Sequence, residues 1–286
     1  MDTPSPLGDL AGLAFRKMNG LGNDFVIIDL RAHRGMKVTE EAARYLGDRA
    51  GPYGCDQIIT IEERAGEPFM GIWNADGSAV GACGNATRCV GQILMDESGE
   101  DAVAFMTPSG PISAERVGTN RVVVDMGEPR LKWEEIPLAE ETQDTRFVDI
   151  KLGPIDKPVL WGPSAVNMGN PHCIFFVEDA DAQALDRFGP MIENHPMFPE
   201  RANVSVAQVK SKYEIRLRVW ERGAGITQAC GTAACAALVA AHRRRLTARK
   251  ASVVLDGGTL AIEWRESDNH VMMAGPVAFE YDGILE

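Results

Sequence analysis

Short apolar runs separated by glycine and polar residues predict β-strands through the first half of the chain. Apolar residues flank the turn signal at 20–23, which indicates a strand, a tight turn and a second strand. Pro108, Gly110 and Gly118 break the last run into short strands. The predicted strands lie in residues 14–30, 56–63, 68–76 and 102–126.

Two segments of this half carry helix signals instead. VTEEAARYLGDR (38–49) predicts a helix with Thr39 as N-cap and two glutamates in its first turn. CGNATRCVGQILMDE (83–97) predicts a second helix that the Asn85 side chain can cap. Ala86 leaves little bulk near the helix axis, so a sheet can curl around this helix.

The second half repeats this order. EIRLRVW (214–220) predicts a strand, CGTAACAALVAAHRR (230–244) a helix that Thr232 can cap, and 251–274 further strands. Residues 127–143 between the halves are polar, contain proline and show no clear periodicity. Many short strands around one small-residue helix in each half predict an α+β fold rather than a βαβ array.

The chain also resembles itself at a fixed offset, which indicates two structurally similar domains. Chance gives one such match easily, but hardly three in the same order. Cys83 with Cys230 and Asn23 with Asn170 are 147 residues apart, and Gly110 with Gly258 is 148 apart.

Composition and charge restrict the class of partner. The chain has 286 residues, 45% of them apolar, with 29 basic and 41 acidic residues and a formal charge of −12. This balance argues against nucleic acid or an anionic membrane as partner. The basic run 243–245 follows a helix and most simply complements its C-terminal dipole. The first twelve residues lack the features of a signal peptide, and CAALVAA is too short to cross a bilayer.

The chain has six cysteines without a CxxC pair. Metal sites rich in cysteine usually show paired spacing, so no metal is expected. A cytoplasmic protein with mostly reduced thiols is the expectation. The cysteines are Cys55, Cys83, Cys89, Cys173, Cys230 and Cys235.

Ala-Cys-Gly before a predicted helix occurs twice, at Cys83 and at Cys230. A helix N-terminus presents free N–H groups to an anion and favours the thiolate of a neighbouring cysteine. Four interpretations remain: small buried residues, a structural disulfide, a thiol-redox or binding role, and a two-base active site at the domain interface. In the last, one thiol removes a proton from one face of a stereocentre while the other returns one to the opposite face. No nucleotide loop or pyridoxal site is indicated, so no cofactor is expected.

The motifs KMNGLGNDF, NADGSAVGACGNATRC, GNPHC and ERGAGITQACGTAACA together resemble the diaminopimelate epimerase family. The resemblance runs from about Lys17 to the C-terminal YDGIL. It implies a cofactor-independent isomerase that interconverts LL- and meso-diaminopimelate in lysine and peptidoglycan precursor biosynthesis. It also implies two pseudo-twofold related domains, each a mostly antiparallel β-barrel wrapped around a central helix. Because the family's last strand returns to the first domain, the expected domains are 1–129 with 275–286, and 130–274.

The resemblance also implies roles for individual residues. Cys83 resembles the acid and Cys230 the base in the LL-to-meso direction, and His172 and Glu221 resemble groups that tune the thiols. Tyr281 corresponds to a position implicated in the contacts of a homodimer. The implied substrate-binding positions are Asn23, Gln57, Asn74, Gly84, Asn85, Asn170, Asn203, Glu221, Arg222, Gly231 and Thr232.

Other interpretations stay open beside these roles. Asn23 and Asn74 are common turn formers, and His172 on its own reads as a buried strand residue. The nearest alternative enzyme is a proline or hydroxyproline racemase, whose substrates have a single carboxylate. Arg222 next to Glu221 suits the distal carboxylate and ammonium of diaminopimelate. A thiol-redox or ligand-binding protein without turnover is the alternative from another class.

Overall fold

The computed structural model describes residues 5–81, 83–154, 156 and 158–286. The chain divides into two compact units. The first comprises Met1–Val124 with Gly275–Glu286, and the second comprises Asp125–Ala274.

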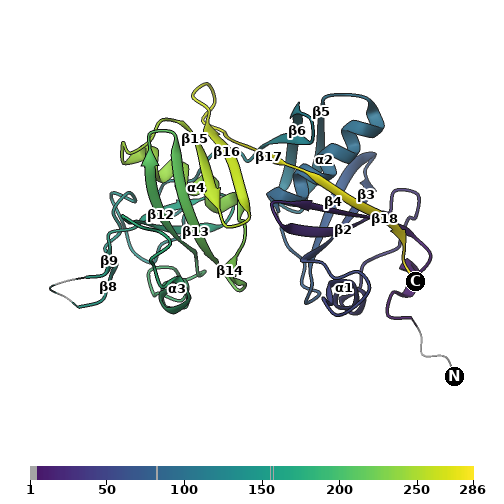
Figure 1. Cartoon of the computed structure of the whole chain (residues 1–286), viewed down its shortest axis with the longest axis horizontal. Coiled ribbons are helices and arrows are strands. Elements are labelled where there is room, and N and C mark those ends of the chain that lie inside the picture. Colours follow the sequence, from purple (N-terminus) through teal and green to yellow (C-terminus); the bar gives the residue numbers. More distant parts are fainter. Residues whose placement is uncertain (1–4, 82, 155, 157) are drawn as a thin grey trace. The chain divides into compact units, whose positions relative to one another are not determined.

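The first unit contains a sheet of consecutive strands, and the C-terminal strand of the chain is added at one edge. The strands follow the order β7-β6-β5-β4-β3-β2-β1-β18, and the C-terminal strand β18 lies against β1 (Figure 1). Neighbours are antiparallel except β2 with β3 and β4 with β5, which are parallel. The strands are β1 (Ala14–Gly20), β2 (Asn23–Asp29), β3 (Gln57–Arg64), β4 (Glu67–Asn74), β5 (Ala102–Thr107), β6 (Gly110–Gly118), β7 (Arg121–Asp125) and β18 (Ala278–Ile284).

Helix α2 (Gly84–Ser98) is the central element of this unit. Every residue from Gly84 to Met95 is buried, and the helix contacts β1, β5 and β6. It ends at Gly99, whose φ of 74° is the left-handed conformation of a helix C-cap. A separate apolar cluster lies under α1 (Glu40–Gly47), and the short 3₁₀ helix Gly8–Leu10 packs into it.

The second unit follows a similar plan. Its main sheet has the order β10-β11-β12-β13-β15-β16-β17, with β14 paired to β13. The β11–β12 and β13–β15 pairs are parallel, and β8 and β9 form a separate hairpin. The strands are β8 (Lys151–Leu152), β9 (Leu160–Trp161), β10 (Ser164–Asn167), β11 (Pro171–Phe176), β12 (Asn203–Ser211), β13 (Glu214–Glu221), β14 (Gly225–Thr227), β15 (Lys250–Leu255), β16 (Gly258–Trp264) and β17 (Val271–Pro276).

Helix α4 (Gly231–Arg243) is buried in this unit as α2 is in the first. It contacts β10, β11, β12, β13, β15 and β16, and its alanines let those strands approach the axis. Helix α3 (Leu185–Glu193) precedes β12 (Figure 1). It covers a second apolar cluster. No helix in the described part of the chain is long and apolar enough to span a membrane.

The basic run after α4 does more than complement the helix dipole. Arg243 does lie in the last turn of the helix. Arg244 instead donates from Nε to the carbonyl oxygen of Arg146 and to Ser164 Oγ, both at 2.9 Å, and it lies over the Phe147 ring. Burial lowers the pKa of Arg244 to about 10. The run therefore fastens the end of α4 to the segment around residue 146.

The α+β fold predicted from the sequence is confirmed, and two local expectations need correction. The N-caps of α2 and α4 are Cys83 and Cys230, so the prediction that Asn85 and Thr232 cap these helices is wrong. Both residues lie one position inside their helices. Helix α3 was not predicted, because a glycine and a proline interrupt its helical pattern.

We predict that Gly91→Ala destabilises the first unit although alanine favours helices. A Cβ on Gly91 would lie 2.6 Å from Ala114 Cβ on β6, so the helix or the strand has to move. Overpacking of this kind costs about 1–3 kcal/mol, which outweighs the roughly 1 kcal/mol gained in helix propensity. Urea unfolding measures the change. Ser98→Ala, at the exposed end of the same helix, is the control. A urea midpoint for Gly91→Ala equal to or higher than that of the wild type would contradict the packing.

Candidate active site

Cys83 is the N-cap of α2, directly before the first helical residue. Its backbone is extended, with φ −148° and ψ 104°. Its carbonyl oxygen accepts from the N–H and the hydroxyl of Thr87, both at 2.9 Å. The N–H groups of the first turn, beginning with Gly84 and Asn85, have no carbonyl one turn earlier to bind. The half-buried sulfur therefore lies where a helix attracts negative charge.

Asn23, the first residue of β2, lies beside that sulfur. Cys83 Sγ is 3.7 Å from Asn23 Oδ1, and Asn85 Nδ2 donates to the same oxygen at 3.3 Å. Asn85 is buried, and its own oxygen accepts from Arg88 at 2.9 Å. The first unit thus brings together Cys83, Asn23 and Asn85.

Gln57 and Asn74 form a second polar pair on neighbouring strands. They lie opposite each other in the β3–β4 register, and Gln57 Nε2 donates to Asn74 Oδ1 at 3.0 Å. Gln57 in turn lies opposite Phe25 on β2, the strand that Asn23 begins. In the described residues the buried Gln57 Oε1 has no hydrogen-bond partner, so it remains an acceptor for a ligand.

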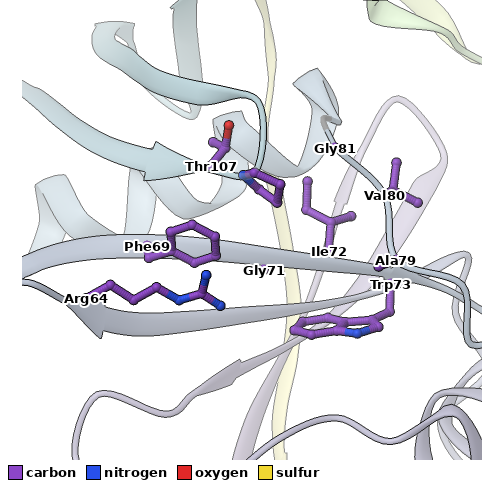
Figure 2. Close-up of a pocket in the computed structure, with 10 residues that line it drawn as sticks. Arg64, Phe69, Gly71, Ile72, Trp73, Ala79, Val80, Gly81 and Thr107 are labelled. Carbon is purple, nitrogen blue, oxygen red and sulfur yellow. The ribbon is translucent and has the colours of Figure 1, made fainter.

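A cavity of about 560 Å³ opens elsewhere on the first unit, along β4 and residues 79–81 (Figure 2). The guanidinium of Arg64 lies over the Phe69 ring, 3.4 Å from its centre, and Trp73 lines the same cavity. None of the predicted site residues lines it.

Cys230 is the N-cap of α4 and is only 6% exposed. Its sulfur lies 3.5 Å from Thr232 Oγ1, and the Glu221 carboxylate at the end of β13 is close enough to act on it. Thr227 donates to Glu221 Oε1 at 2.5 Å. The second unit thus brings together Cys230, Thr232 and Glu221.

The ionisation of Cys230 differs from the sequence-based expectation. Burial raises the pKa of its thiol well above the usual value, and the negative charge of Glu221 raises it further. Thr232 and the N–H of Ala233 lower the pKa, as expected at a helix N-terminus, but they are outweighed. Without a ligand Cys230 is therefore a thiol at neutral pH.

His172 and Asn170 form a buried group at the start of β11. His172 Nε2 lies 2.8 Å from Asn170 Oδ1, and its ring is completely buried. Burial, helped by the charge of Arg222, lowers the pKa of His172 to about 3. His172 is therefore a neutral imidazole at physiological pH.

Asn203 links that group to Arg222. Its Nδ2 donates to the Pro171 carbonyl at 3.1 Å, and its Oδ1 accepts from the backbone N–H of Arg222 at 3.0 Å. Asn203 also lies opposite His172 in the parallel β11–β12 pair. The Arg222 guanidinium donates to the Glu200 carbonyl at 2.8 Å. These contacts hold both the backbone and the guanidinium of Arg222, and the preceding residue, Glu221, acts on Cys230.

Tyr281 is part of β18 and is not joined to either cysteine group by any hydrogen bond given for the described residues. It is 43% exposed, and its ring packs edge-on against Phe15 with 6.0 Å between ring centres. Its predicted place in a homodimer contact remains a prediction.

Three residues that contact the site were not predicted from the sequence. Arg88 and Asp56 bind the side chains of Asn85 and Asn23, and Thr227 binds Glu221. The sequence held one signal for them, an arginine between the small and apolar residues Ala86, Cys89 and Val90 of a predicted helix. Asp56 and Thr227 are ordinary loop and strand-end residues without a recognisable pattern.

Each unit therefore holds a cysteine at the N-terminus of a buried helix, with amide, hydroxyl or carboxylate groups around the sulfur. Backbone N–H groups at such a terminus can bind a carboxylate. A thiol next to a bound carboxylate can exchange a proton with the adjacent α-carbon. The same chemistry is available in both units, with different neighbours in each.

Comparison with known proteins gives a consistent result. The sequence profile for diaminopimelate epimerase matches residues 15–132 and 164–280. Diaminopimelate epimerase of Nitrobacter hamburgensis is 48% identical over 285 residues, covering 98% of this chain and 97% of that protein. Diaminopimelate epimerase of Caulobacter vibrioides is 51% identical over 283 residues, covering 95% and 96%.

Solved structures share the fold at much lower identity. A hydroxyproline epimerase from Agrobacterium vitis, with bound trans-4-hydroxy-L-proline, has a TM-score of 0.63 and 14% identity, and the match covers 96% of this chain and 90% of that one. At this identity the likeness concerns the fold alone.

We predict that Glu221→Gln lowers the pKa of Cys230. Glutamine keeps the size of the side chain but removes the charge that opposes the thiolate, while the larger effect of burial remains. Because each pKa unit changes the thiolate fraction tenfold, Cys230 should be alkylated about tenfold faster by iodoacetamide at a fixed pH near neutrality. Peptide mapping over a pH series measures this rate.

Glu214→Gln, at the exposed start of the same strand, is the matched control and should leave the rate unchanged. An unaltered Cys230 profile in Glu221→Gln would show that Glu221 does not act on the sulfur.

Proposed function

The chain belongs to the diaminopimelate epimerase family, and on that premise we propose that it interconverts LL- and meso-diaminopimelate, as an isomerase of lysine and peptidoglycan precursor biosynthesis. The observation that carries this proposal is the matched pair of cysteines, each the N-cap of a helix buried in its own unit. Inversion of a stereocentre needs a proton carrier for each face, and two such cysteines supply one carrier each.

The reacting carboxylate binds to the first-turn N–H groups of both helices, at Gly84 and Asn85 and at Gly231 and Thr232. These donors stabilise the negative charge that spreads from the α-carbon onto the carboxylate when the proton leaves. In the LL-to-meso direction Cys230 takes the proton and Cys83 gives its own to the opposite face. Cys230 then holds a proton and Cys83 a negative charge, so the reverse reaction starts from that state.

The raised pKa of Cys230 is compatible with its role as a base. The α-hydrogen of an amino acid is a very weak acid, and a thiolate of high pKa is a stronger base than an ordinary one. When the substrate binds near Cys230, its ammonium supplies positive charge that favours release of the thiol proton to water, which leaves the thiolate that the reaction needs. In the free enzyme the Glu221 charge disfavours ionisation of the Cys230 thiol. His172 is neutral and therefore adds no charge to the site.

The distal end of the substrate binds to polar groups of both units. Arg222 holds the distal carboxylate by charge-assisted hydrogen bonds, and Asn203 fixes the backbone from which Arg222 projects. Glu221 and the Gln57 carbonyl oxygen are acceptors for ammonium groups. Asn23, Asn74 and Asn170 complete the proposed set.

Two further features belong to the proposal. A mechanism with two thiols needs a reducing compartment, which favours the cytoplasm. The exposed Tyr281 on β18 is proposed to contribute to a homodimer. No added cofactor is required, because both proton carriers are side chains of the chain itself.

The alternative enzyme is a proline or hydroxyproline racemase. Relatives that are 48–51% identical over nearly the full length support diaminopimelate as the substrate. The hydroxyproline epimerase shares only the fold, at 14% identity. A redox or binding protein would invert no amino acid.

We predict that purified, reduced protein without added cofactor converts LL-diaminopimelate to the meso isomer and leaves L-proline and trans-4-hydroxy-L-proline unchanged. Chiral chromatography of the reaction mixtures measures all three. Cys83→Ala and Cys230→Ala should each lower turnover by at least about a thousandfold, because one face loses its proton carrier.

Cys173→Ala, which alters a cysteine on β11 buried in the apolar cluster under α3, is the control and should retain turnover. Turnover of proline in place of diaminopimelate, or wild-type turnover by Cys83→Ala, would overturn the proposal.

A further inference from the structure

A chain of four side chains runs past the Cys83 sulfur, and its two ends have fixed hydrogen-bonding roles. Arg88 donates to Asn85 Oδ1 at 2.9 Å, Asn85 Nδ2 donates to Asn23 Oδ1 at 3.3 Å, and Asn23 Nδ2 donates to Asp56 Oδ2 at 2.9 Å. A guanidinium can only donate, and a carboxylate can only accept. The direction of every bond in between follows from these two ends.

Each asparagine amide can otherwise turn over, exchanging its oxygen for its nitrogen. Arg88 can donate only to the oxygen of Asn85, which turns the Asn85 nitrogen towards Asn23. Asp56 accepts only the nitrogen of Asn23, which leaves the Asn23 oxygen facing both Asn85 and Cys83. Cys83 Sγ lies 3.7 Å from that oxygen, so the sulfur is the donor and carries a proton.

We propose that Arg88 and Asp56 are positioning residues that fix this chain from opposite ends, so that an oxygen faces the Cys83 sulfur and holds it as the loaded proton donor. The consequence for turnover rests on the proposed function, whereas the orientation of the amides does not. Cys83 then enters the LL-to-meso reaction already protonated.

The surroundings of Arg88 show that the arrangement is built into the fold. Arg88 is completely buried although it carries a charge. Gly20 on β1 makes room for it, since a Cβ there would lie 2.9 Å from Arg88 Nη2. At the other end, Asp56 is held by Arg49 and accepts from the backbone N–H of Asp24 at 3.1 Å.

At the equivalent positions of the second unit the residue types differ. The offset of 147 residues places Cys235 where Arg88 stands and Thr232 where Asn85 stands. The Thr232 hydroxyl can donate or accept, so it does not set the protonation of Cys230. The four-residue chain therefore distinguishes one cysteine of the pair from the other.

Charged groups around Cys83 would also affect its reactivity, and the test has to separate the two effects. The Arg88 guanidinium and the N-terminus of α2 favour the thiolate, while Asp56 opposes it and is itself partly neutralised by Arg49. Removing Arg88 alone by Arg88→Gln should slow alkylation of Cys83, and removing Asp56 alone by Asp56→Asn should speed it modestly. Together the two substitutions leave the net charge unchanged.

The decisive protein is the full chain with Asp56→Asn and Arg88→Gln combined. Both ends can then donate or accept, so the chain can reverse and present the Asn23 nitrogen to the sulfur, which stabilises the thiolate. We expect Cys83 to react with iodoacetamide at pH 7 about tenfold faster than the product of the two single effects, measured by peptide mapping in a double-mutant cycle. If the alkylation rate of the double variant equals the product of the two single effects, the proposal is overturned.

The matched control combines Asp56→Asn with Arg88→Lys. Lysine can only donate, so Asn85 stays oriented and the Cys83 profile should stay within about twofold of Asp56→Asn alone. A tenfold rise in this control would also overturn the proposal. Because alkylation needs no substrate, these results stand or fall independently of whether the protein turns over diaminopimelate.

If the buried Arg88→Gln change prevents folding, the wild-type protein supplies the test. The infrared S–H stretch of Cys83, identified as the difference from Cys83→Ala, should be present at neutral pH and shifted by its hydrogen bond to a carbonyl oxygen. Absence of this band at neutral pH would show a thiolate and overturn the proposal.

Discussion

Burial of a helix within the strands of its own unit is the constraint on which the rest of the structure depends. The first N–H groups of a helix have no partner inside the helix, and strands cannot supply carbonyl groups to all of them. In α2 and α4 these groups lie next to a cysteine rather than a capping side chain. A serine or asparagine at the N-cap would satisfy one N–H itself, whereas cysteine leaves the terminus able to bind a ligand.

The same frame carries different chemistry in the two units. Around Cys83, neutral amides are held in place by Arg88 and Asp56. Around Cys230, the Glu221 carboxylate acts directly on a more deeply buried sulfur. A reaction that inverts a stereocentre needs one protonated and one deprotonated carrier at any moment, so two identical environments would not define which thiol is loaded. The internal repeat explains the common backbone, and its departures explain the difference between the two thiols.

The sequence allowed prediction of the features that depend on local pattern. The strands flanking each glycine turn, the Thr39 cap, and the helices that follow the two cysteines need only apolar spacing and composition. The caps proposed at Asn85 and Thr232 failed, because the helices begin one residue after the cysteine. Asn85 instead uses its side chain for Arg88 on the same helix and for Asn23 on β2, an element far away in the chain. Helix α3 was missed for a local reason, because Gly189 and Pro190 lie inside it and interrupt the helical pattern.

The roles of the site residues depend on tertiary contacts that spacing does not reveal. Burial sets the pKa of Cys230 and of His172, and no pattern of neighbours along the chain gives the depth of burial. The resemblance to a family supplied the site residues, and the structure supplies the hydrogen bonds between them.

The central claim is that each cysteine serves one face of the α-carbon, and isotope labelling tests it most directly. LL-diaminopimelate is incubated in heavy water, and both isomers are recovered early in the reaction for mass and NMR analysis of the α-position. The delivering thiol is already deuterated by the solvent, so the meso product should carry deuterium while the remaining LL isomer stays mostly unlabelled. Meso product that retains its original α-hydrogen, or equal early labelling of both isomers, would contradict the account.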